Sequence, residues 1–417
     1  MKKLCLCLLL QLCVFAVAQE SILDSSTVRM FYRVYRRFLA NNYGTKNEAR
    51  MIRLRNEKIF QDEIPLDVPF PCNVTDGRSP EVPESVHRLR PGDIDVIAAM
   101  GDSIVVGLGL TSINFFDLMV ENRGIVANIG GQETWRKYLT LPNILKEYNP
   151  KLIGYSYEDS ISTEPGAGLN VAECGAMSKD MPYMAQHLVN KIKNDSRIDV
   201  NKHWKLITLM IGANDFCGNV CTASCPWSIL EDHRKNLISA LRILRDNLPR
   251  TIVFVLTPPN GKEIVASRRG TDTMWICYVY SMLFCPCMFG LKYADQRPIY
   301  YEIIERWQDM EEEITNYPEF NRNDFTAVFI PILKRSSIPL DENNLPDLSY
   351  LAYDYFHFNQ KAHAIFANTL WNNIFEPVGN KSETLSDCNK KLDMLLCPTP
   401  ERPFLATREN SRSINET

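Results

Sequence analysis

Apolar residues recur along the chain in two patterns, and each pattern predicts one kind of element. Short runs rich in Val, Ile, Leu and Phe, each closed by Gly, Pro or polar residues, predict buried strands. Longer segments repeat apolar residues at intervals of three and four, as amphipathic helices do. The predicted strands cover residues 95–100, 125–129, 204–211, 251–256 and 326–330, and the predicted helices cover residues 115–122, 141–148, 181–193, 229–247, 299–314 and 360–375.

The order of these elements predicts the fold class. Strands and helices alternate, which is typical of an α/β domain whose mostly parallel sheet is covered by helices on both faces. We therefore expect a three-layer α/β/α sandwich over residues 93–380. Residues 19–92 are predicted to form an N-terminal helical arm and a Pro-rich linker, and residues 381–417 a polar C-terminal tail.

The start of the chain has the layout of a secretory signal peptide. Lys2 and Lys3 precede the apolar run 4–14, and the small residues at 16–18 fit a cleavage site. The run is too short to span a membrane, and no other run reaches the ~20 apolar residues that a span needs. We therefore expect a mature chain that starts at Gln19, is secreted to the extracellular space and has no transmembrane segment.

The arm is predicted to begin with a helix that Thr27 caps and Gly44 ends. Its arginines allow two interpretations: a basic helix that touches lipid headgroups, or a helix docked on the main domain with its polar face in water. The second is favoured. Net charge gives no support to a nucleic-acid partner, because the mature chain has 44 basic and 50 acidic residues and so no basic footprint.

Cysteine content supports the predicted export. Of 13 cysteines, three lie in the signal segment, and the remaining ten are an even number, which favours disulfides in an oxidising compartment. Zinc held by Cys217, Cys221 and Cys225 with His233 is the alternative, but the chain has no second Cys/His pair at finger spacing. No metal or other cofactor is expected. Glycosylation sequons stand at Asn73, Asn194, Asn380 and Asn415.

A serine follows the first predicted strand directly. Ser103 ends the sequence Gly101-Asp102-Ser103, at the edge where open α/β sheets bind ligands. A serine hydroxyl becomes a nucleophile only when a base takes its proton. The alternative is a turn serine that caps the next helix.

Three other stretches carry matching polar groups. Gly130 and Gly131 close the second predicted strand and could leave backbone N–H groups open to a ligand, or could form an ordinary turn. Asn214 follows the central strand and could donate to an oxyanion, or form an Asx turn or cap. Asp354 precedes His357 by three residues, so the carboxylate could orient the imidazole, although this spacing is common by chance.

Taken together, these four blocks resemble the GDSL (SGNH) hydrolase superfamily, and the wider text resembles its phospholipase B group. The resemblance runs from about residue 72 to residue 379 and is carried by the segments 86–91, 129–131, 140–145, 168–172, 203–206, 357–358, 370–373 and 376–379. It implies Ser103 as nucleophile, and Asp354 and His357 as the other triad members. Ser103, Gly131 and Asn214 are implied as the oxyanion hole, with no metal.

The resemblance also implies a function: a secreted serine esterase that hydrolyses phospholipids and lysophospholipids at a membrane or micelle surface through an acyl-enzyme. A carboxylesterase or neutral lipase, a glycan acetyl esterase and a non-catalytic lipid-binding protein remain alternatives on the same scaffold. Three residues depart from the group's pattern, namely Ile104 for Leu, Gln132 for an acid and Tyr355 for Cys. The apolar segment 274–291 is a candidate wall of the lipid pocket, with plain core packing as the alternative.

Overall fold

A four-stranded parallel sheet forms the centre of the molecule. The computed structural model describes residues 26–267, 275–385 and 395–415. Strands β1 (Ile94–Gly101), β2 (Trp204–Met210), β3 (Thr251–Leu256) and β4 (Phe325–Ile330) lie side by side in this order, and each pair is parallel. β2, β3 and β4 are buried along their whole length, which explains why the sequence shows continuous apolar runs rather than alternation.

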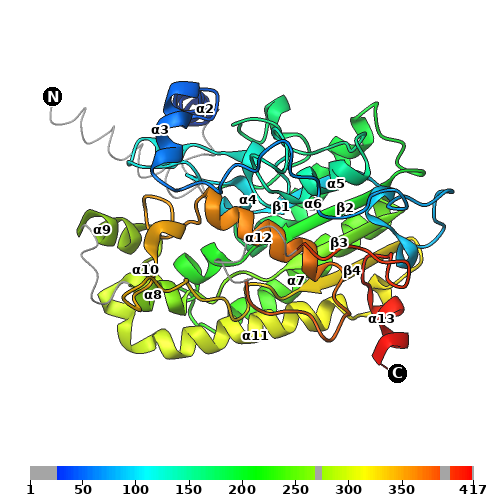
Figure 1. The fold of residues 1–417 in the computed structure, drawn as a ribbon. Helices are drawn as coiled ribbons and strands as arrows, with labels where there is room; N and C mark the ends of the chain where they lie inside the picture. Colours follow the sequence, from blue (N-terminus) through cyan, green and yellow to red (C-terminus); the bar gives the residue numbers. More distant parts are fainter. Residues whose placement is uncertain (1–25, 268–274, 386–394, 416–417) are drawn as a thin grey trace.

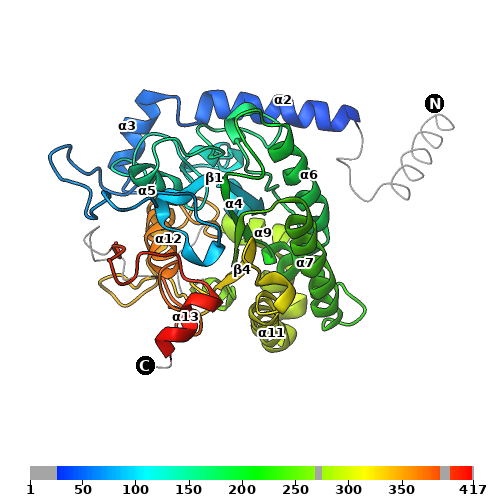
Figure 2. The ribbon, with the colours of Figure 1, turned by 90° about the vertical axis from the view of Figure 1, so that its right-hand side faces the viewer.

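Helices cover both faces of the sheet, so the predicted α/β/α sandwich is confirmed (Figures 1 and 2). Side chains that alternate along β1 show the two faces. Ile97 and Ala99 share a core with α5 (Leu141–Tyr148) and α12 (Gln360–Asn373). Val96, Ala98 and Met100 share a second core with α6 (Met181–Asn194), α7 (Ser228–Asn247) and α11 (Arg297–Thr315). The bounds of these five helices differ from the predicted ones by at most two residues.

Two predicted elements are absent. Residues 115–122 form only the 3₁₀ turn η4 (Asp117–Met119), and the predicted strand 125–129 follows another such turn, η5 (Arg123–Ile125). The run is buried as expected, but its neighbour Gly130 bridges Ser156 rather than β1. Apolar composition therefore predicted burial correctly, while pairing partners follow from contacts that a short run does not encode.

The free edge of β1 is covered instead by two irregular segments. Ile97 N–H donates to Ile153 O at 2.8 Å, and Val171 N–H donates to Ala99 O at 2.9 Å. Glu173 N–H then donates to Gly101 O at 3.1 Å. The chain after residue 168 thus runs parallel to the end of β1 and arrives beside Ser103.

The arm and the tail both pack onto the main domain. Leu54, Phe60 and Leu89 from the arm and Leu405 from the tail are buried in the same core as α5 and α12. A disulfide joins Cys72 to Cys397 across 325 residues.

The remaining helical elements are α2 (Ser26–Tyr43), α3 (Glu48–Asn56), α4 (Ser103–Val106), α8 (Lys262–Ser267), α9 (Trp275–Phe284), α10 (Pro286–Phe289), α13 (Arg408–Asn415), the π-helical turn η8 (Asp215–Asn219) and the 3₁₀ turns η2 (Val86–Arg88), η3 (Pro91–Asp93), η6 (Pro165–Ala167), η7 (Ser178–Asp180), η9 (Leu291–Gln296), η10 (Pro318–Phe320) and η11 (Leu348–Tyr350).

Helix α2 is docked, but not by the face that the sequence analysis favoured. Among the side chains of this helix that the structure describes, those of Arg36 and Leu39 are buried, and Arg36 pairs with Glu121. Phe31 and Phe38 on the same helix are 65% and 57% exposed. These two aromatic side chains therefore face solvent rather than the main domain. Within the described ranges, no helix has both the length and the apolar character to cross a membrane.

Candidate active site

The turn after β1 presents Ser103 at the carboxyl edge of the sheet. Asp102 caps α4, because its Oδ1 accepts the Ile104 N–H at 3.0 Å. Gly101 is required here, since a Cβ at this position would lie 2.4 Å from Met210 O on the neighbouring strand. The tight turn leaves Ser103 7% exposed, at the edge where open α/β sheets bind ligands.

The loop before α12 brings an acid and a base to this serine. Asp354 Oδ1 accepts the N–H groups of Phe356 at 2.9 Å and His357 at 3.0 Å. Tyr355, which lies between Asp354 and Phe356, has φ 54°, a left-handed conformation that the fold imposes on a bulky residue. Asp354 Oδ2 lies 2.6 Å from His357 Nδ1, and His357 Nε2 lies 2.8 Å from Ser103 Oγ. Hydrogen bonds thus connect all three side chains.

The electrostatics of the pair favour proton uptake by the imidazole. Burial acts to lower the pKa of His357, but the Asp354 carboxylate outweighs it, and the pKa of His357 is raised above 6.5. Burial acts to raise the pKa of Asp354, yet the nearby imidazole and the hydrogen bonds to this carboxylate lower it below its usual value. A charged carboxylate therefore faces the nitrogen opposite the one that contacts Ser103.

Gly131 does not supply an open N–H group, contrary to the sequence prediction. Its N–H donates to Ser156 O at 2.6 Å, and the Gly130 N–H donates to Val126 O at 2.9 Å. A Cβ on Gly131 would lie 2.3 Å from the ring of Tyr155. The glycine pair thus serves close packing and backbone hydrogen bonding, and the expected role of Gly131 in an oxyanion hole is excluded by this geometry.

Gly175 has the open backbone N–H group that the sequence predicts for Gly131. It is exposed, with φ 79°, and a Cβ there would meet no atom within 4 Å. Among the described residues its N–H has no acceptor. The segment that carries Gly175 follows the pairing of Glu173 with Gly101 and so lies beside Ser103.

Asn214 lies where the sequence predicted, at the end of β2 and at the start of η8. Its Nδ2 donates to Ala176 O at 2.9 Å, which ties it to the residue after Gly175. An amide carries two N–H donors, so one remains for a ligand. Ser103, Gly175 and Asn214 therefore gather at one place, and the signal that the sequence analysis missed is the glycine five residues after Asn170.

Buried polar groups hold these donors in place from behind. Arg123 is fully buried and donates to the carbonyls of Asn170 and Ala172 at 3.2 and 2.8 Å. Asp215 Oδ2 accepts the Ser178 N–H at 2.9 Å, and burial is the main cause that raises the pKa of Asp215 to about 7. The segments before and after Gly175 are thus both anchored.

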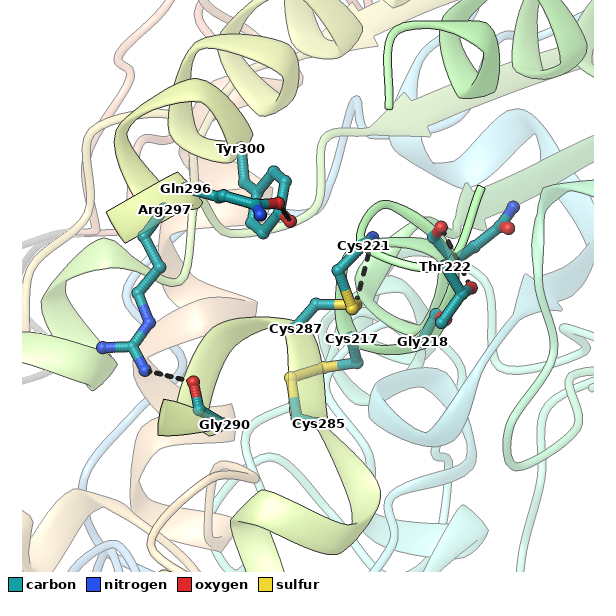
Figure 3. Close-up of a disulfide and its surroundings, with 11 residues drawn as sticks. Cys217, Gly218, Cys221, Thr222, Cys285, Cys287, Gly290, Gln296, Arg297 and Tyr300 are labelled. Atoms are coloured by element: carbon teal, nitrogen blue, oxygen red, sulfur yellow. Dashed lines mark hydrogen bonds between the residues drawn. A yellow bond between two sulfur atoms is a disulfide. The ribbon is translucent and has the colours of Figure 1, made fainter. Parts of the chain in front are cut away.

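Two disulfides build a wall beside the site. Cys217 of η8 bonds to Cys285, and Cys221, two residues after η8, bonds to Cys287 of α10, so the zinc alternative is wrong for these residues (Figure 3). His233, its predicted fourth member, hydrogen bonds to Ser178 Oγ at 2.8 Å. The described residues contain no group of three or more His, Cys, Asp or Glu side chains that could hold a metal ion.

A small cavity of about 30 Å³ separates this wall from His357. Cys285, Met288 and Phe289 line it, so the second half of the segment 274–291 lies beside the imidazole, and its role as a wall for lipid stays a prediction. The side chain of Trp275 lies outside the described residues, and Phe284 is 63% exposed. The cavity is mostly apolar and opens directly on the imidazole.

Comparison with known proteins shows the family of this chain. A family model described as GDSL-like Lipase/Acylhydrolase matches residues 97–370, which include Ser103, Asn214, Asp354 and His357. The chain belongs to the GDSL-like lipase/acylhydrolase family. The membrane-associated phospholipase B1 proteins of Homo sapiens and Rattus norvegicus are 37% and 36% identical to it over 342 and 337 residues. Within the GDSL-like family the chain is therefore similar to a part of these phospholipase B1 proteins.

These relatives are much longer than this chain. The alignments cover 80% and 81% of this chain but 23% of each relative, so this GDSL-like chain spans less than a quarter of their length. Among solved structures, LAE5, an alpha/beta hydrolase enzyme from the metagenome of Lake Arreo, matches with TM-score 0.31 and 15% identity over 66% of this chain and 92% of its own. The extracellular lipase of Streptomyces rimosus matches with TM-score 0.29 and 12% identity over 64% and 94%.

Proposed function

We propose that this chain is a serine ester hydrolase that cleaves acyl ester bonds of phospholipids and lysophospholipids. The observation that carries the proposal is the chain of hydrogen bonds from Ser103 Oγ to His357 at 2.8 Å and from His357 to Asp354 at 2.6 Å. Lipid substrate is supported by the apolar cavity at His357 and by the name of the relatives, phospholipase B1.

In the first half of the reaction, Ser103 Oγ attacks the ester carbonyl carbon while His357 Nε2 takes its proton. Asp354 keeps the tautomer of His357 and stabilises the imidazolium that forms. The negative charge on the carbonyl oxygen is stabilised by N–H donors, for which we assign the backbone of Ser103 and Gly175 and the amide of Asn214. His357 then protonates the leaving alcohol, and the acyl group stays on Ser103.

In the second half, water replaces the alcohol. His357 takes a proton from the water as it attacks the acyl carbon, and the same N–H donors stabilise the second oxyanion. The bond to Ser103 Oγ breaks, His357 returns the proton to that oxygen, and the fatty acid leaves. None of these steps requires a metal ion, because charge is stabilised by N–H groups throughout.

We further propose that the mature protein is secreted, with residues 1–18 removed. The three disulfides support this, since such bonds persist in oxidising compartments. A membrane or micelle surface would then supply the substrate from outside the cell.

Labelling and product analysis test the proposed function together. A fluorophosphonate probe should label the wild-type protein and not Ser103→Ala, which should also lose about six decades of kcat. Product analysis by mass spectrometry should show free fatty acid and glycerophosphocholine from phosphatidylcholine. If Ser103→Ala kept a tenth of wild-type turnover, the assigned nucleophile would be wrong. Turnover of acetyl esters but not of phospholipid would favour the carboxylesterase or glycan esterase alternative. If the probe does not label the wild-type protein, the lipid-binding alternative is favoured.

A further inference from the structure

A second, larger cavity lies next to the one at His357. Its volume is about 210 Å³, against about 30 Å³ for the first. The two share part of their lining, so they are adjacent. The shared residues are Pro259, Asn260, Gly261, Ile264 and Phe358. We call the cavity at His357 the near cavity and the larger one the far cavity.

The far cavity has the lining expected for an alkyl chain. Leu333, Ile338, Ile365 and Leu385 contribute aliphatic side chains from β4's following loop, from α12 and from the start of the tail. The hydroxyl of Ser336, which also lines it, is used within the protein: it donates to Ile332 O at 2.7 Å and accepts the Leu385 N–H at 3.0 Å. A cavity of ~150 Å³ with such a lining is large enough to bind benzene, so this one admits a larger apolar group.

The near cavity lies closer to the reacting atoms than the far cavity does, so an acyl chain on Ser103 would reach the two in that order. His357 and Ile104 line only the near cavity, so the first carbons of an acyl chain on Ser103 meet that cavity first. Phe358, the residue after His357, lines both cavities and so lies where they are adjacent. A chain that extends past Phe358 and Ile264 enters the far cavity.

We propose that the far cavity is an acyl-chain subsite that holds the distal methylenes of long-chain substrates and so sets a preference for long acyl chains. This inference rests on the proposed esterase function and adds a specificity site to it. Each buried methylene should then raise kcat/KM by about fourfold until the far cavity is filled. Short acyl chains use the near cavity alone.

Two residues on one loop provide a matched test. Ile338 lines the far cavity, whereas Leu340, two residues later, is 59% exposed and lines neither cavity. Ile338→Trp and Leu340→Trp make the same kind of change, so only the first should fill the subsite. The experiment measures kcat/KM of wild type and both variants on p-nitrophenyl acetate, butyrate, laurate and palmitate.

The readout is the ratio of kcat/KM for laurate to that for acetate. Ile338→Trp should lower this ratio at least tenfold, and Leu340→Trp should leave it within twofold of wild type. Ile365→Phe, which fills the same space from α12, should lower it as well and protects the test against a folding defect in one variant. Acetate turnover reports that each variant is folded.

Three outcomes would overturn the subsite. The first is an unchanged ratio in both Ile338→Trp and Ile365→Phe. The second is an equal loss of acetate and laurate turnover in these variants, and the third is the same drop in Leu340→Trp. Failure of the proposed function looks different: wild type would then hydrolyse none of the four esters, whatever the state of the far cavity.

Discussion

At the scale of single residues, the pairing of His357 with Asp354 determines how the site responds to pH. The imidazole must be neutral to accept the Ser103 proton, and its pKa lies above the ordinary 6.5 because Asp354 outweighs the effect of burial. Activity should therefore rise with pH through a limb centred above 6.5 and be lost below it. A kcat profile measured at constant ionic strength checks this, and full activity at pH 4 would contradict it.

Replacing the acid tests the same pair from the other side. Asp354→Asn removes the charge that raises the pKa of His357, so the residual activity should show its acidic limb at lower pH than wild type. The amide also favours the wrong tautomer, which should cut kcat by about 10⁴. A lower kcat with an unmoved limb would mean that Asp354 orients the ring without setting its pKa.

Asn214 offers a separate test of the oxyanion donors. Asn214→Ala should lower kcat by about 10²- to 10³-fold with a smaller change in KM, because one donor to developing charge contributes about 2.7–4 kcal/mol. Asn219→Ala, in the same turn η8, is the matched control and should change neither constant. An effect confined to KM would assign Asn214 to substrate positioning instead.

The glycines show what the residues of the sequence could and could not predict. Ser103, His357 and Asp354 were predicted because each stands at a recognisable position after a strand or before a helix. The pair Gly130-Gly131 suggests an oxyanion donor at Gly131, yet such a donor needs a free N–H group next to the serine. Gly175 has that N–H group because residues 169–173 follow the edge of β1, a contact invisible in the local pattern.

At the scale of elements, the five helices that pack on the sheet and the four strands were predictable because their faces or whole lengths are buried, which leaves periodic or continuous apolar runs. The edge of β1 was not, because its partners are short irregular segments around residues 153 and 170. Helix α2 is docked as predicted, but the ion pair of Arg36 with Glu121 lies in the contact, while Phe31, Tyr35 and Phe38 stay exposed.

The two disulfides Cys217–Cys285 and Cys221–Cys287 should act together. They close loops of nearly the same extent, with separations of 68 and 66 residues, so either bond alone still constrains most of the unfolded chain. The loop-entropy model gives a cost of about 2.5 kcal/mol for removing one and about 7 kcal/mol for removing both. Cys217→Ala/Cys285→Ala should therefore destabilise by less than half as much as the quadruple alanine variant.

Urea unfolding with a fixed m-value measures both costs. Cys225→Ala is the control, since Cys225 is exposed and forms no disulfide with any described residue, and it should leave the free energy of unfolding unchanged. Equal and additive costs for the two bonds would show that each holds its own local geometry rather than a shared loop.

At the scale of the whole molecule, the proposed chemistry is complete without a metal ion. N–H donors stabilise the oxyanion, so a cation is not required for that charge. Release of fatty acid from phosphatidylcholine micelles should therefore persist in excess EDTA. Activity that EDTA removes and only added calcium restores would rule out the mechanism, and p-nitrophenyl butyrate turnover in the same buffers separates an effect on the micelle from one on the enzyme.

The bond between Cys72 and Cys397 has a consequence for how this protein tolerates damage. It turns the chain from residue 72 to residue 397 into one covalent ring. A protease that cuts the ring once opens it into a line but releases no fragment, and the sheet, Ser103 and His357 stay on a single molecule. A single cut within the ring therefore does not remove any part of the protein until a reductant breaks the disulfide.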